Sequence, residues 1–180
     1  MRAKLFFVVG LLPVLFMTAG CRQKAMPGNS PAAICVTDFR GEELCFQSSP
    51  SKVVCLIESA LSGIYMLREQ ERVAGIPGDI YSTRVFSYYA QLDSRIREKS
   101  LPAPGNWDFV SIEQVVALQP DLVIMWKSQE EAIRSLGKFG IPVYAVMMNS
   151  FEDVFKEISD FGVLFSCAAR ADSLISLTRS

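Results

Sequence analysis

The spacing of the hydrophobic positions changes along this chain, and the changes predict its elements. Short continuous apolar runs at 52–57, 72–76, 122–126 and 142–148 are typical of strands covered on both faces, as in a parallel sheet. Helical spacing of apolar residues predicts helices over 61–68, from 112 to about 119, over 129–139 and from 151 onward. The alternation of strand and helix predicts an α/β fold with a core sheet of four to five strands.

A β-hairpin is predicted ahead of the first buried strand, at the edge of the sheet. Its arms are ICVTD from Ile34 and ELCFQ to Gln47, joined by a turn at Phe39 to Gly41. Cys35 and Cys45 lie on the two arms. A one-residue shift of register moves a side chain to the other face, so a disulfide and a pair of buried thiols both remain open. The pairing of Cys55 and Cys167 is equally open.

The stretch from Gly105 to Trp126 (GNWDFVSIEQVVALQPDLVIMW) combines a loop, a helix and a buried strand. Ser111 and Gln114 have capping-box spacing, so the helix is predicted to begin near Ile112. Two large rings, Trp107 and Phe109, stand in the loop, which is rich in Gly and Pro. Packing alone seldom requires such rings in a loop, which makes this loop a candidate binding element.

The N-terminal residues predict export. Arg2 and Lys4 precede 13 apolar residues ending at Met17, too few to span a bilayer as a helix, and small residues then lead to Cys21. This pattern resembles a bacterial lipoprotein signal over residues 1–20, with Cys21 as the lipidated residue. An ordinary signal peptide that leaves Cys21 as a free thiol is the alternative. Residues 21–33 are polar and rich in Pro, Gly and Ser, as in a flexible tether.

Composition weakens several functional classes. The chain has 18 basic and 19 acidic residues, so charge does not indicate a nucleic-acid partner. It contains no histidine, which excludes Ser-His-Asp and Cys-His nucleophile systems and zinc enzymes with histidine ligands. No glycine-rich phosphate motif follows a strand, and the cysteine spacings match no zinc signature. The sequence therefore predicts neither an enzyme nor a metal site formed by the protein's own side chains.

Several segments in order resemble the substrate-binding proteins of ABC importers for iron-siderophores, haem and cobalamin. The opening VTDFRGEELCFQSSPSKVVCLIESALSGIYML, then RVAGIP, the 105–126 stretch, IPVYAV and SFEDVFKEISDFGVLF all resemble this family, over about Ile34 to Ala171. The resemblance implies a three-layer, Rossmann-like first lobe over 34–150, preceded by the hairpin. A long linking helix over 151–180 would lead to a second lobe.

The resemblance also implies a ligand site at the carboxyl ends of the strands. Its candidate ligand-binding residues are Glu58, Ser59, Tyr81, Asn106, Trp107 and Asp108. Flat rings at Trp107 and Tyr81 would suit a macrocycle or catecholate. The alternative for each ring is that it only packs within the lobe, and Trp107 would then be a lid over the core. Glu58 is equally well explained as a helix cap. Glu113 matches the glutamate that docks onto an arginine of the permease in the family, and its place near a helix N-terminus also suffices to explain it.

Two functional hypotheses follow. The first is a lipid-anchored binding protein, or its first lobe, on the periplasmic or extracellular face of the membrane. It would deliver an iron chelate, haem or cobalamin to an ABC permease, without a cofactor of its own. The second is a one-lobed, lipid-anchored interaction protein that has lost small-ligand binding. The sequence ends at Ser180, within the expected linking helix. Whether it is a fragment, a frameshifted product or a one-lobed protein stays open.

Overall fold

A computed structural model describes residues 33–179, and its centre is a four-stranded parallel sheet. The strand order is β4 (Val73–Gly75), β3 (Val53–Cys55), β5 (Leu122–Trp126) and β6 (Val143–Val146). The strand β5 lies between β3 and β6, and its first four residues are fully buried. The predicted parallel sheet is therefore confirmed, with 122–126 as an interior strand. The predicted signal peptide, Cys21 and most of the tether lie outside the described residues.

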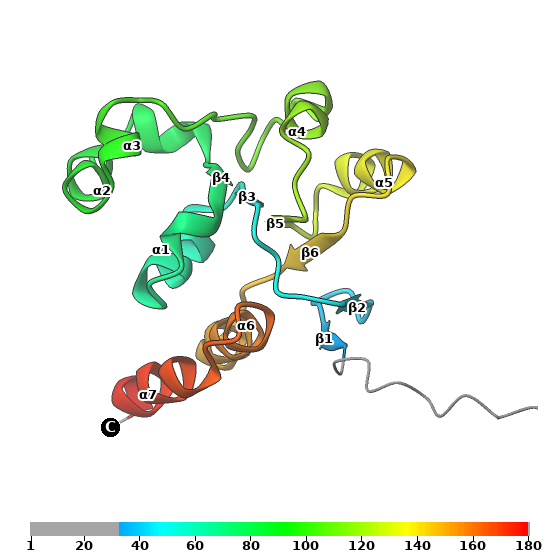
Figure 1. The fold of residues 1–180 in the computed structure, drawn as a ribbon, viewed down its shortest axis with the longest axis vertical. Coiled ribbons are helices and arrows are strands. Elements are labelled where there is room, and N and C mark those ends of the chain that lie inside the picture. Colours follow the sequence, from blue (N-terminus) through cyan, green and yellow to red (C-terminus); the bar gives the residue numbers. More distant parts are fainter. Residues whose placement is uncertain (1–32, 180) are drawn as a thin grey trace, which may run out of the picture. The chain divides into compact units, whose positions relative to one another are not determined.

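Helices alternate with the strands along the chain (Figure 1). They are α1 (Glu58–Met66), η1 (Gln70–Arg72), η2 (Gly78–Tyr81), α2 (Phe86–Leu92), α3 (Ser94–Arg97), α4 (Ile112–Leu118), α5 (Glu130–Lys138), α6 (Phe151–Leu164) and α7 (Ala168–Arg179). Segment 79–101, for which the sequence analysis gives no element, contains the two short α-helices α2 and α3. The first helix also begins earlier than predicted, because Glu58, Ser59 and Ala60 form its first turn rather than a loop.

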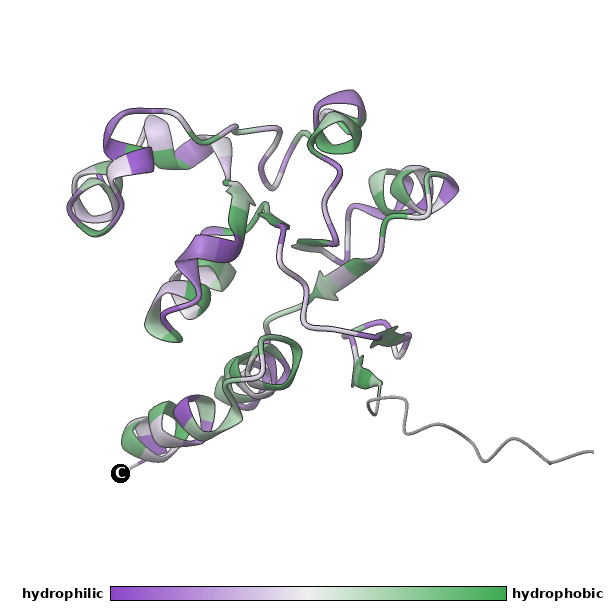
Figure 2. Cartoon of the chain, in the orientation of Figure 1, coloured by the Kyte–Doolittle hydropathy of each residue, from purple (hydrophilic) through white to green (hydrophobic). Residues whose placement is uncertain are grey.

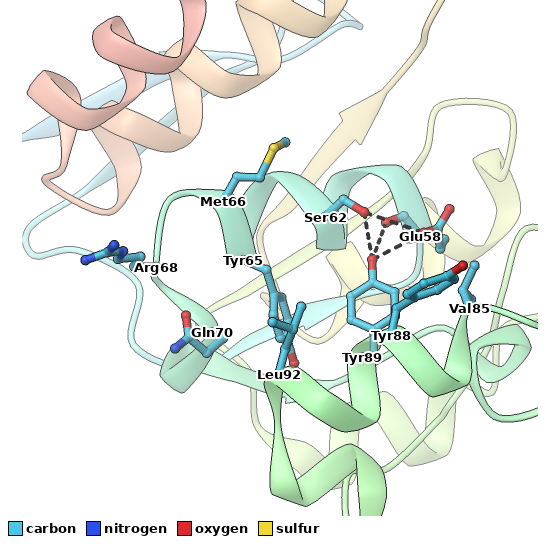
Figure 3. A pocket seen from close by; sticks show the side chains of 10 residues that line it. All are labelled: Glu58, Ser62, Tyr65, Met66, Arg68, Gln70, Val85, Tyr88, Tyr89 and Leu92. Carbon is cyan, nitrogen blue, oxygen red and sulfur yellow. Dashed lines mark hydrogen bonds between the residues drawn. The ribbon is translucent and has the colours of Figure 1, made fainter. Parts of the chain in front are cut away.

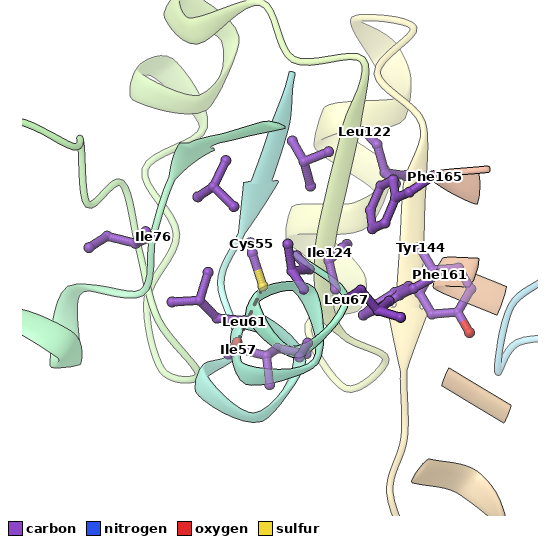
Figure 4. Packing of buried hydrophobic residues seen from close by; sticks show 14 of the residues in the cluster. Cys55, Ile57, Leu61, Leu67, Ile76, Leu122, Ile124, Tyr144, Phe161 and Phe165 are labelled. Atoms are coloured by element: carbon purple, nitrogen blue, oxygen red, sulfur yellow. Dashed lines mark hydrogen bonds between the residues drawn. The ribbon is translucent and has the colours of Figure 1, made fainter. Parts of the chain in front are cut away.

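Helices cover both faces of the sheet, as the three-layer prediction requires. Side chains of a strand point alternately to opposite faces. Cys55 and Ile124 accordingly join the cluster with α1 and α6, whereas Val54 and Val123 join the cluster with α4 and α5. Figure 4 shows the first cluster, with the rings of Tyr144, Phe161 and Phe165 side by side. In Figure 2 the strands are hydrophobic, and α5 exposes hydrophilic residues on its outer side.

The hairpin packs at the β6 edge of the sheet, as predicted. It comprises β1 (Ile34–Thr37) and β2 (Glu43–Phe46). The Phe39 N–H donates to the Ala145 carbonyl at 3.2 Å, and the Ala145 N–H donates to the Asp38 carboxylate at 3.1 Å. Register places Cys35 opposite Cys45, and the two form a disulfide. The structure thereby decides between the two alternatives that the sequence left open.

The segment 151–180, expected as one linking helix, contains two helices. It begins as predicted, with a capping box between Ser150 and Asp153. After α6 the backbone turns at Ser166, which has a left-handed φ of 59°. The N–H of Cys167 then donates to the Gly162 carbonyl at 2.8 Å, which closes a Schellman motif. Helix α7 packs back against α6 through Gly162, where a Cβ atom would stand 2.6 Å from the Ala171 Cβ.

Among the described residues, no helix combines the length and the apolar character that crossing a membrane would require. Lipid anchoring would depend on Cys21, which lies outside those residues.

Candidate functional site

The loop between Gly105 and Val110 stands at the carboxyl edge of the sheet and is held there by its backbone. Gly105 forms isolated bridges with Pro77, which follows β4, and with Val110. A Cβ atom at Gly105 would lie 2.5 Å from the Phe109 carbonyl oxygen and 2.9 Å from the Val110 Cα. Only glycine permits such a close approach of two backbone segments.

Asn106 joins three segments at this edge through its side chain and its carbonyl. Its Nδ2 donates to the Asp79 carboxylate at 2.8 Å, which ties the loop to η2. Its Oδ1 accepts the N–H groups of Asp108 and Phe109 at 2.9 and 3.0 Å, and its backbone oxygen accepts Gln129 Nε2 at 2.9 Å. Asn106 therefore positions the loop. Gln129, which the sequence did not single out as a site residue, is one of its partners.

This bracing leaves the rings of Trp107 and Phe109 exposed. Trp107 is 65% exposed and belongs to neither core cluster, which removes the alternative that it covers the core. Its side chain lines an open groove of about 620 Å³ between the loop, the start of α4 and the first half of α5. The groove is lined by Trp107, Asp108, Val110, Ile112, Ser128, Gln129, Glu130, Glu131, Ala132 and Ser135. Its charged groups are all carboxylates, which disfavours an anion there.

The structure does not bring Tyr81 to Trp107. The Tyr81 ring packs against the core beside Phe86, its hydroxyl donates to the Leu101 carbonyl at 2.8 Å, and the ring does not line the Trp107 groove. Burial raises the pKa of the Tyr81 phenol. Tyr81 therefore has the packing role that the sequence left open as its alternative, and its contact with a ligand stays a prediction.

Glu58 and Ser59 lie in the first turn of α1, on the same edge of the sheet. Both are exposed. Glu58 Oε1 accepts the Tyr89 hydroxyl at 3.3 Å and the Ser62 hydroxyl at 3.5 Å, so its side chain faces α2 (Figure 3). Glu58 does not line the Trp107 groove. It caps no backbone N–H, since α1 has no side-chain cap.

Glu113 occupies the second position of α4, as predicted, and its side chain is exposed. Ser111 accepts the Gln114 N–H at 3.4 Å, which positions the start of this helix. Within the described residues Glu113 makes no hydrogen bond or ion pair, so its carboxylate is available to a partner. It lies one position from Ile112, which lines the Trp107 groove.

One cluster of the described residues brings together side chains of types that can bind a metal ion. Cys35, Glu43 and Cys45 offer atoms within 4.8 Å of one another. Both sulfur atoms belong to the disulfide, however, and a disulfide supplies no thiolate to a metal.

Known proteins match this chain at the level of family and fold. Residues 53–179 match the model of a family described as periplasmic binding protein. A vitamin B12-binding protein of Vibrio parahaemolyticus serotype O3:K6 (strain RIMD 2210633) is 36% identical over 56 residues, which are 30% of this chain and 20% of that protein.

Solved structures share the fold at lower identity. A periplasmic solute binding protein from Veillonella parvula DSM 2008 superposes with a TM-score of 0.72 at 23% identity, over 81% of this chain and 44% of that one. A petrobactin-binding protein from Bacillus subtilis superposes with a TM-score of 0.67 at 19% identity, over 81% and 49%. The chain thus spans about half the length of these structures.

Proposed function

Because this chain belongs to the periplasmic binding protein family, we propose that it is the first lobe of an exported substrate-binding protein of an ABC importer. Its ligand would be a metal chelate of the cobalamin, haem or iron-siderophore type. The observation that carries the proposal is Trp107, an exposed ring on a loop that Gly105 and Asn106 hold rigidly at the carboxyl edge of the sheet. A rigid ring supplies a large contact area at a low cost in conformational entropy.

Charge narrows the ligand class. Asp108, Glu130 and Glu131 line the groove beside Trp107, and no basic side chain lines it. Anionic ferric catecholates would be repelled there, whereas a neutral corrinoid would not. A relative of this chain is named as a vitamin B12-binding protein. We therefore place cobalamin-type ligands first and haem and iron-siderophores after them.

Glu113 is the proposed contact with the permease. It is exposed and unpaired within residues 33–179, at the positive end of a helix dipole. Arginine of a permease would form a charge-assisted hydrogen bond with this carboxylate. The membrane anchor would be a lipid on Cys21, which would keep the protein close to that permease.

Calorimetric titration of the purified chain with cyanocobalamin, haem and a ferric siderophore tests the ligand. A single lobe leaves one face of the ligand in water, so the expected Kd lies between about micromolar and millimolar. Trp107→Ala should abolish binding, and Glu113→Ala should leave it unchanged. Nanomolar binding by this chain alone would contradict the two-lobed site. The absence of binding by the folded chain would instead favour the interaction-protein alternative.

The permease contact needs a separate measurement. Glu113→Ala and Glu113→Gln should both weaken association with the permease reconstituted in nanodiscs, whereas Glu42→Gln, at an exposed carboxylate in the hairpin turn, serves as the matched control. Equal association of the wild type and both Glu113 variants would remove Glu113 from the proposed docking contact.

A further inference from the structure

A second cavity of about 640 Å³ lies along the outer side of α1, between α1 and α2 (Figure 3). It is lined by Glu58, Ser62, Tyr65, Met66, Arg68, Gln70, Val85, Tyr88, Tyr89 and Leu92. Its volume is in the range of sites for small organic molecules, and such sites are mainly apolar with a few polar groups. It shares only Glu58 with the candidate residues of the cobalamin-type site, and it contains neither Trp107 nor Asn106.

The base of this cavity is preorganised. The rings of Tyr65 and Tyr89 meet edge to face with their centroids 5.3 Å apart. The Tyr65 hydroxyl donates to the Asp93 carboxylate at 2.8 Å, and the hydroxyls of Tyr89 and Ser62 lie 2.7 Å apart. A ligand on this base would not have to immobilise either ring, which lowers the entropic cost of binding.

The rim of the cavity is apolar and faces solvent. Met66, Tyr88 and Leu92 are 48%, 68% and 66% exposed. Surface apolar residues that occur singly are common, but here three converge on one cavity. A hydrophobic ligand body lying on Tyr65 and Tyr89 would cover all three.

The two charged lining residues are at opposite ends of α1. Glu58 begins the helix and Arg68 follows its last turn, a separation of roughly 15 Å at 1.5 Å per residue. The Glu58 carboxylate already accepts the hydroxyl of Tyr89. Within residues 33–179 the Arg68 guanidinium makes no hydrogen bond or ion pair, and the Gln70 side chain beside it lines the same cavity.

From this geometry we propose that the cavity between α1 and α2 binds an amphiphilic organic monoanion, an alkyl or aryl carboxylate. Its anionic group would lie at Arg68 and Gln70, and its apolar body would lie over Tyr65, Tyr89 and Leu92. The far end of the ligand is uncharged, because a second carboxylate would meet Glu58. The guanidinium is suited to a carboxylate, since its N–H groups match both oxygens.

The test compares decanoate with decanedioate, which has the same length and a carboxylate at each end. Titrations of the full chain are followed by the backbone amide NMR signals of α1 and α2. Decanoate should shift these signals saturably, with a Kd on the order of 0.1 to 1 mM. Decanedioate should bind at least about tenfold more weakly, and Glu58→Gln should restore its binding.

Arg68→Gly removes the guanidinium without a folding defect. Arg68 has a left-handed φ of 64° at the end of α1, a conformation that glycine adopts more readily. The variant should therefore keep or raise the melting temperature and weaken decanoate binding about tenfold. Arg68→Lys should bind decanoate with an intermediate Kd, and Arg134→Gln on α5 serves as the charge-matched control with an unchanged Kd.

Several results would each overturn the proposal. These are signals of α1 and α2 that do not shift, an unchanged Kd in Arg68→Gly, and equal binding of decanoate and decanedioate to the wild type. Equal weakening by Arg134→Gln would likewise overturn it, because only the net charge would then matter.

Discussion

Glu157 makes the stability of this protein dependent on pH, and Glu157→Gln should remove that dependence. The residue lies on the inner side of α6 and is 2% exposed. Its Oε2 atom has no hydrogen-bond partner among the described residues. Burial is the main cause that raises the pKa of Glu157 to about 8, and the nearby Asp160 carboxylate adds to it.

The direction in which stability changes with pH follows from the number of protons that the folded and unfolded states bind. An unfolded glutamate has a pKa near 4.5, so between about pH 4.5 and 8 the folded state holds a proton that the unfolded state has released. The free energy of unfolding therefore falls as pH rises through this window, by up to about 1.4 kcal/mol per pH unit. Between pH 5 and pH 7 the loss from this residue amounts to roughly 2 to 3 kcal/mol.

Urea unfolding at pH 5, 6, 7 and 8, followed by circular dichroism, measures the effect. Glutamine does not titrate, so the variant should lack this loss of stability. From pH 5 to pH 7 the unfolding free energy of Glu157→Gln should therefore rise relative to that of the wild type by roughly 2 to 3 kcal/mol. Any constant cost of burying the amide cancels in this comparison. The reasoning fails if the two pH profiles run parallel, or if the variant loses stability relative to the wild type as pH rises.

Three further predictions concern other parts of the chain. Gly162→Ala should destabilise the fold by about 1 to 3 kcal/mol in urea unfolding, because the added Cβ would clash with α7. The control Gly137→Ala on α5 places a Cβ that meets nothing within 4 Å, so it should be neutral or stabilising. Equal changes in unfolding free energy for the two variants would contradict the close packing of α6 on α7. Replacing both cysteines of the Cys35–Cys45 disulfide with serine should lower the unfolding free energy by about 2 to 3 kcal/mol, as expected for a loop of this length, and no change would show that the hairpin needs no crosslink. Cys21→Ala should move the protein out of the membrane fraction or block its processing, and an unchanged membrane fraction would refute lipidation.

Much of the candidate site could be anticipated from local pattern, because its signals are contained in short segments. The capping residue Ser111 predicted where α4 begins, and Glu113 follows directly at its second position. The large ring of Trp107 in a loop rich in Gly and Pro marked that loop as a candidate binding element, and the structure leaves the ring exposed. The resemblance to substrate-binding proteins implied that this loop would lie at the carboxyl ends of the strands.

Relations between distant segments were not in the local pattern. Tyr81 and Trp107 are alike as sequence features, but the hydroxyl of Tyr81 meets the Leu101 carbonyl and its ring packs on the core, which only the folded chain decides. The cavity between α1 and α2 depends on two helices meeting side by side. Residues 85, 88, 89 and 92 do have helical spacing, and that spacing was the available signal for α2.

The sequence by itself thus determined the class of the fold, the interior place of 122–126 and the family resemblance, because hydrophobic period and capping chemistry act over a few residues. The tertiary structure decided the hairpin register that joins Cys35 to Cys45 and the break of the last helix at Ser166. The register depends on cross-strand pairing, where one residue changes the face. The break depends on Gly162, which lets α7 pack closely against α6, a contact that no helical period predicts.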